Sequence, residues 1–188
     1  MSKKPVIDHE ILSILEDYHL FIDSDKHIEM PFCVNKVDRN HITSLKGSSD
    51  LTTTAPIGNT VLECEVRERN EFNYSFKILS DAITSRMLFR MDEGDGTHWN
   101  RHFPIPVDQQ QVITPHFHKK GDDGIEYAYR NDLINNKPSP LNIHDGFTIL
   151  CDECHIDKDK MEIIVLEEGE IPFEYDQNPD PLKGVNFL

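Results

Sequence analysis

The stretch LECEVRERNEFNYSFKI, residues 62–78, decides the fold, because apolar and polar side chains alternate in it on both sides of Arg69 and Asn70. An alternation of period two predicts β-strands with one buried face and one polar face. Arg69 and Asn70 separate the two alternating runs and predict a turn. We therefore expect residues 62–78 to form an antiparallel hairpin.

Further strands and two helices flank this hairpin. The same alternation predicts a third strand over 83–92 and a second hairpin made of 112–118 and 125–130. Apolar residues at helical spacing predict amphipathic helices over 8–22 and 143–155. We expect an α+β fold in which a mainly antiparallel sheet of five or six strands packs against the N-terminal helix and the second helix.

The C-terminal end differs from the rest in composition. Residues 1–170 are predicted to form one domain, within the usual size range. Residues 171–188 contain three prolines and are predicted to form an extended acidic tail. The segment 152–180 holds eleven acidic and two basic residues. It is either a solvated face or an arm that contacts a basic partner.

Charge restricts the classes of partner. The chain has 19 basic and 34 acidic residues and a formal net charge of -15. Such a charge repels nucleic acid and anionic membranes at long range, so nucleic acid is expected as a partner only if a local basic patch exists. A basic protein surface is the complementary alternative.

Location is inferred from what the sequence lacks. No apolar run approaches the roughly 20 residues of a membrane span. No apolar segment follows Met1 to Pro5, so an export signal is not expected. We expect a cytoplasmic protein with no membrane partner and with its four cysteines reduced.

A cluster of polar residues carries the only concentrated chemical signal. Its members can bind metal or transfer protons, and they are Arg90, Asp92, His98, His102, His116 and His118. His116 and His118 are two apart, which places both on one face of a strand, and the same holds for Arg90 and Asp92. If the two strands are neighbours, all four side chains line one surface, over which the loop histidines can fold.

Three interpretations of this cluster stay open. His116, His118, His98 and Asp92 are suited to a divalent transition metal such as zinc. Alternatively, the three histidines act as catalytic acid and base groups while Arg90 binds a phosphate. The third interpretation is an inert, exposed pair of histidines.

Aromatic residues near the cluster suggest where a substrate would bind. Trp99, the only tryptophan, and Tyr127 and Tyr129 are candidate substrate-binding residues that could stack on a base or ring. The alternative is that these side chains pack a sheet face.

A second pattern, from Cys151 to His155, has the Cys-x-x-Cys-His spacing of haem attachment. The absence of an export signal argues against haem, and helical spacing favours buried thiols. A zinc site would require Cys33 or Cys64 nearby, and the spacing for a redox motif is unfavourable.

The stretch 86–129 resembles a group of bacterial proteins that carry a domain of unknown function. The likeness rests on Arg90-Met91-Asp92, a loop histidine at His98, the strand Pro115-His116-Phe117-His118 and the return strand Glu126-Tyr127-Ala128-Tyr129. It covers about a quarter of the chain and departs in the loop 99–112 and in the acidic extension. The resemblance implies that these positions form one site, and it implies no activity.

Three functions follow as hypotheses. The first is a hydrolase of phosphodiester or phosphate substrates, such as a small phosphoesterase or nuclease, that acts through the histidine and arginine cluster. The second is a non-catalytic acidic binding or inhibitory module of a phage-defence or toxin-antitoxin kind. The third is a domain with a structural metal site. The net charge of -15 argues against the first function, because such enzymes usually have a basic face. The segment 98–130, however, holds four basic and four acidic residues and is locally neutral.

Overall fold

A computed structural model describes most of the chain. The described residues are 5–28, 31–37, 44–94, 96–101, 105–157 and 162–166. His102 and the predicted tail 171–188 lie outside them.

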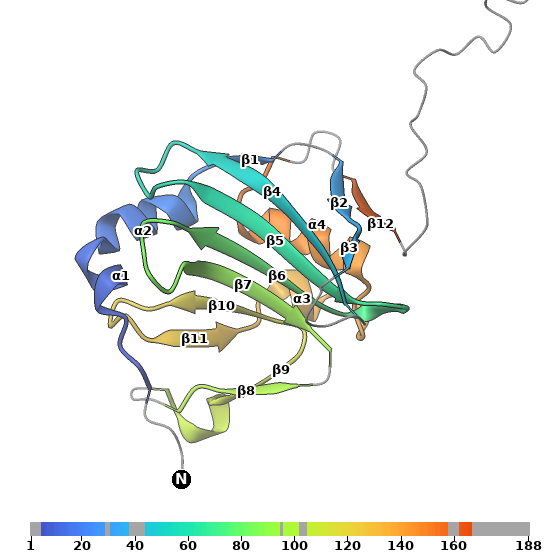
Figure 1. Ribbon diagram of the computed structural model, residues 1–188. Helices are drawn as coiled ribbons and strands as arrows, with labels where there is room; N and C mark the ends of the chain where they lie inside the picture. The colour runs from blue at the N-terminus through green and yellow to red at the C-terminus, as the bar shows by residue number, and fades with distance from the viewer. Residues whose placement is uncertain are drawn as a thin grey trace, which may run out of the picture.

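An antiparallel sheet dominates the fold (Figure 1). Its hydrogen-bonded order is β1 (Lys26–Ile28), β4 (Ser44–Thr53), β5 (Thr60–Arg67), β6 (Asn70–Ser80), β7 (Met87–Glu93), β10 (His116–Lys120) and β11 (Glu126–Tyr129). β3 (Lys36–Val37) adds an eighth strand by pairing with β4. The α+β class and the antiparallel sheet are confirmed. The strand count exceeds five or six because β1 and β3 are too short to show an alternation.

A glycine in β4 allows a second strand to pass close to the sheet. Residues 46–50, rich in glycine and serine, lie in the middle of β4. A Cβ atom at Gly47 would collide with the backbone carbonyl of Cys33 in β2 (Phe32–Val34). Glycine at this position therefore allows β2 to cross closely. β2 pairs in parallel with β12 (Ile163–Val165).

The helices match the predictions with one break. The predicted helix over 8–22 consists of α1 (His9–Ser13) and α2 (Leu15–Asp23), separated at Ile14. Residues 143–155 contain α4 (Ile143–Glu153), and a short helix α3 (Asp132–Asn135) precedes it. The helices and one sheet face share a buried core, to which Tyr18, Phe21, Phe147 and Leu150 contribute from the helices. No helix in the described ranges is long and apolar enough to cross a membrane.

A separate two-stranded ribbon lies next to β11 (Figure 1). It pairs β8 (Thr97–Trp99) with β9 (Gln111–Ile113), and a 3-10 turn η1 (Val107–Gln109) lies between them. Residues 97–99, which lie outside the strands predicted from the sequence, therefore form a strand. The second hairpin begins at His116 rather than at 112, because residues 111–113 pair with β8.

Candidate functional site

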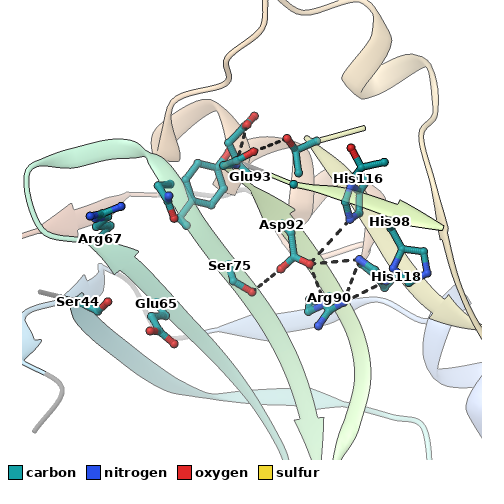
Figure 2. A pocket seen from close by; sticks show the side chains of 16 residues that line it. Ser44, Glu65, Arg67, Ser75, Arg90, Asp92, Glu93, His98, His116 and His118 are labelled. Atoms are coloured by element: carbon teal, nitrogen blue, oxygen red, sulfur yellow. Dashed lines mark hydrogen bonds and ion pairs between the residues drawn. The ribbon is translucent and has the colours of Figure 1, made fainter. Parts of the chain in front are cut away.

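Strand register brings the two polar pairs of the sequence together. β10 pairs with β7 so that His116 lies opposite Asp92 and His118 lies opposite Arg90. Side chains two apart share a face, so all four gather on the polar side of the sheet (Figure 2). Phe117, between the histidines, is fully buried on the other side. The strand adjacency on which the predicted cluster depended is present.

His98 reaches the same place from the ribbon. Its ring centroid lies 4.7 Å from that of His118 and 6.2 Å from that of His116. The side chain of Asn100 fixes the end of β8, because it donates to the Ala128 carbonyl at 2.7 Å and accepts from the Ala128 amide at 2.8 Å. Three imidazoles therefore converge from two separate elements.

Asp92 lies at the centre of the cluster. Its Oδ2 atom is 3.2 Å from His118 Nε2 and 4.0 Å from His116 Nε2, and its Oδ1 atom accepts a 2.7 Å hydrogen bond from Ser75 Oγ. Burial favours the neutral carboxyl, but the hydrogen bond from His118, the charge of Arg90 and the Ser75 hydroxyl outweigh it and lower the pKa of Asp92 to about 2. Asp92 is therefore a carboxylate at neutral pH.

Glu126 and Ser75 complete the site, although the sequence did not assign them a role. Glu126 Oε1 lies 3.1 Å from His118 Nδ1 and 3.4 Å from Arg90 Nη2. Burial raises the pKa of Glu126, but His118 and Arg90 outweigh this effect and leave it below the usual value. The alternation within β11 places Glu126 on the face of Ala128, which pairs with His118. The position of Glu126 in the site can therefore be predicted only when the register of β11 against β10 is known.

Arg90 links the acidic groups. Its Nη2 atom lies 3.0 Å from His118 Nε2 and 3.2 Å from His118 Nδ1. Its Nε atom is 3.0 Å from Asp92 Oδ2, close enough for an ion pair but without the direction of a hydrogen bond. The guanidinium thus lies between two carboxylates.

His116 is buried and electrically neutral. It is 4% exposed, and its Nδ1 atom has no hydrogen-bond partner of ordinary geometry. Burial, assisted by neighbouring His118, lowers the pKa of His116 to about 4, and the Ile113 backbone and Asp92 offset only part of this effect. The pKa of His98 is also lowered, mainly by burial. Neutral imidazole is the form that binds a metal ion.

The cluster meets the spatial requirement of a metal site. Asp92, His116 and His118 each offer one ligand atom, and these atoms all lie within 4.8 Å of one another. They form the one such group of histidine, cysteine and acidic residues found in the described ranges. A cavity of about 490 Å³ opens over them, and Glu65, Arg67 and Ser75 line it as well (Figure 2).

Tyr127 and Tyr129 do not join the histidines. Tyr129 pairs with Phe117 in the sheet register, so it lies on the buried face with Phe117. Its ring centroid is 5.4 Å from that of Phe117, and its hydroxyl donates to Glu153 of α4 at 2.5 Å. Tyr127 shares this face because it lies two positions away. We therefore remove both tyrosines from the candidate site, while Trp99, next to His98, is 43% exposed.

The four cysteines, all within the described ranges, form no disulfide and lie apart from the cluster. Cys151 and Cys154 are buried at the end of α4, as helical spacing predicted, and Cys64 is buried in the sheet. Burial raises the pKa of Cys154 well above its usual value. Cys64, Cys151 and Cys154 thus have the properties of structural thiols.

Comparisons with known proteins add no family to this picture, and the resemblance of residues 86–129 stays a prediction. No family model, no curated protein and no solved structure matches the chain.

Proposed function

We propose that Asp92, His116 and His118 bind a divalent transition metal ion, with zinc as the leading candidate, and that the centre hydrolyses phosphate esters. One observation carries the proposal, namely that three ligand atoms from two paired strands lie within 4.8 Å of one another. Two imidazoles and one carboxylate form a ligand set that leaves coordination positions open for water and substrate.

The groups behind the ligands support the metal site. His118 turns Nδ1 toward Glu126 and Nε2 toward Asp92. A carboxylate that accepts the Nδ1 proton leaves the Nε2 lone pair free for a metal and fixes the ring orientation. Ser75 orients Asp92 in the same manner. His118 and Asp92 therefore each have a hydrogen-bonding partner of the kind that orients metal ligands in proteins.

Arg90 supplies the group that would bind the phosphate. Its Nη2 atom lies 3.0 Å from His118 Nε2, in the space that a metal would take, so metal binding requires the guanidinium to move. The ion pair between Arg90 and Glu126 does not involve the metal position and would keep Arg90 at the edge of the site. Arg90, together with Arg67 in the wall of the same cavity, would then neutralise the phosphate oxygens as charge develops in the transition state.

The reaction that follows is a displacement at phosphorus by water. A metal ion held by Asp92, His116 and His118 would supply an activated water, because such ions lower the pKa of a bound water to about 7. The neutral His98 ring accepts a proton from the attacking water, whose oxygen forms a bond to phosphorus. The bond from phosphorus to the leaving oxygen breaks, and that oxygen takes a proton from solvent. The products are the free alcohol and phosphate, or a phosphate monoester from a diester.

The proposal is tested on the full chain with p-nitrophenyl phosphate and bis(p-nitrophenyl) phosphate. Protein stripped with a chelator should gain activity when zinc or manganese is restored. Asp92→Asn and His118→Ala should each lower kcat/KM by about 100-fold or more, as removal of transition-state stabilisation does in other enzymes. His144→Ala, an exposed histidine on α4, should leave activity unchanged. Activity that survives both the chelator and the two site variants would refute the proposal.

The acidic binding module has less structural support. Its evidence is the charge of residues 152–180, most of which lie outside the described ranges. We therefore keep it as an alternative to be adopted if the metal site fails.

A further inference from the structure

A second cavity adjoins the histidine cluster. It has a volume of about 880 Å³, and its wall includes His98, Trp99, Arg101, Glu126 and the segment 5–10. His98 lines both cavities. Glu126, in the wall of the second cavity, contacts His118 and Arg90 of the first. The two cavities are therefore neighbours, and His98 forms part of the wall of each.

The side chains that line the second cavity are suited to binding a flat aromatic ring. Trp99 is 43% exposed, although large aromatic side chains usually bury most of their surface. The guanidinium carbon of Arg101 lies 5.5 Å from the centroid of the Trp99 ring. Ile7 and Val6 add exposed apolar surface to the same wall. An exposed indole beside an arginine and apolar side chains is a sequence-tolerant stacking surface for bases.

The stacking surface is held in place before any ligand binds. Trp99 pairs with Gln111 inside the ribbon, and the next residue, Asn100, makes two hydrogen bonds with the Ala128 backbone. Ile7, which also lines the cavity, forms a bridge with Ile125. Fixed walls reduce the entropy cost of ligand binding.

We infer that the second cavity binds the aromatic ring of a nucleotide whose phosphate reaches Arg90 and Asp92. The inference rests on the proposed function and names its substrate class, a mononucleotide-type phosphate ester. The chain's charge of -15 favours a single nucleotide over a polymer, because each additional phosphate adds repulsion. The Tyr127 and Tyr129 rings on the other sheet face play no part in it.

Trp99 is the only tryptophan, so its fluorescence reports directly on the second cavity. We would titrate the full chain with AMP, adenosine and ribose 5-phosphate. Saturable quenching by AMP and adenosine, but not by ribose 5-phosphate, supports ring binding. No saturable change with adenosine or AMP overturns it, and so does equal quenching by ribose 5-phosphate.

Variants separate stacking from a general loss of structure. Trp99→Ala should weaken adenosine binding about 5- to 150-fold, which is the range for removal of one stacked base. Calorimetry measures the affinity. Trp99→Phe should recover most of the affinity. Phe72→Ala, at an aromatic residue of similar exposure on β6, should have no effect. Wild-type affinity in Trp99→Ala overturns the inference.

The failure of this inference can be told apart from failure of the proposed function. The His116→Ala/His118→Ala variant lacks two metal ligands but keeps the second cavity, so adenosine should still quench Trp99 in it. If adenosine binds and no ester is hydrolysed, the ring site stands and the hydrolase fails. If p-nitrophenyl phosphate is hydrolysed and adenosine does not bind, the ring site fails and the hydrolase stands.

Discussion

His118 is the residue on which the site depends most. It is 1% exposed, and its two ring nitrogens face two different carboxylates, Asp92 at 3.2 Å and Glu126 at 3.1 Å. In the proposed centre these carboxylates have different roles, because Asp92 binds the metal and Glu126 orients the ring. Glu126 is therefore a positioning residue, and its effect should appear in metal affinity.

Glu126→Gln should lower zinc affinity about 10- to 100-fold, the usual cost of losing an outer-shell partner. The substitution keeps the size of the side chain but removes the charge that draws the His118 proton to Nδ1. Competition with a chromophoric chelator measures the change. Glu71→Gln, at an exposed position of β6, is the matched control. Equal zinc affinity in Glu126→Gln and wild type would show that Glu126 does not orient the ligand.

At this scale the sequence predicted which residues form the polar pairs, but it left open whether Tyr127 and Tyr129 bind substrate or pack a sheet face. His116 and His118 share a face in any strand, and so do Arg90 and Asp92, because the side-chain period of a strand is two. The face occupied by β11 depends on its register with β10, in which Tyr129 lies opposite Phe117. A shift of one residue would have put both tyrosines beside the histidines.

At the scale of elements, the ribbon of β8 and β9 determines where His98 and Trp99 lie. Each of its strands has three residues, too few for an alternation to be recognised. The sequence therefore predicted no strand at 97–99 and assigned 112–113 to the second hairpin. Asn100 joins the ribbon to the sheet and is 4% exposed. Its side chain provides the two hydrogen bonds that a further strand would have offered to Ala128.

Asn100→Ala should lower the free energy of unfolding by about 1–3 kcal/mol, because it leaves a buried amide and carbonyl of Ala128 without partners. Chemical denaturation gives the free energy, and hydrogen exchange at the Ala128 amide should become faster. Gln109→Ala, at an exposed position of η1, should change neither quantity. Unchanged exchange at Ala128 would mean that Asn100 does not hold the ribbon.

The start of α1 gives a pH-dependent prediction. Asp8 accepts a hydrogen bond from the Ile11 amide, and its Oδ2 atom lies 3.4 Å from Lys120 Nζ. Burial raises the pKa of Asp8, but the Ile11 hydrogen bond and Lys120 outweigh it and leave the pKa below 3.8. A carboxyl with a lowered folded-state pKa stabilises the fold above its unfolded pKa, and this contribution is lost as pH falls through the folded value.

Asp8→Asn should therefore destabilise the protein by about 1 kcal/mol at neutral pH, and this difference from wild type should close in acid, below pH 3.8. Urea denaturation at a series of pH values measures both effects. Asp108→Asn, at an exposed aspartate, is the control. A difference that stays constant down to the acid limit would rule out the charge of Asp8 as its cause.

At the scale of the whole molecule, the sheet separates a core from a site. Phe76, Met91 and Phe117 lie across neighbouring strands on the buried face, and Ser75, Asp92 and His116 lie across the same strands on the polar face. The period of two in the sequence predicted this division and the α+β class. It could not predict the order of the strands, the crossing at Gly47 or the two cavities, because these depend on contacts between distant segments.

The measurement that tests the central claim most directly is metal content by elemental mass spectrometry. It is made on full-length protein purified without a histidine tag, dialysed against zinc and then against buffer. Wild type and His144→Ala should retain about one equivalent of zinc, and the His116→Ala/His118→Ala variant should retain none. Wild-type protein without zinc, or equal zinc in wild type and the double variant, would contradict the metal centre.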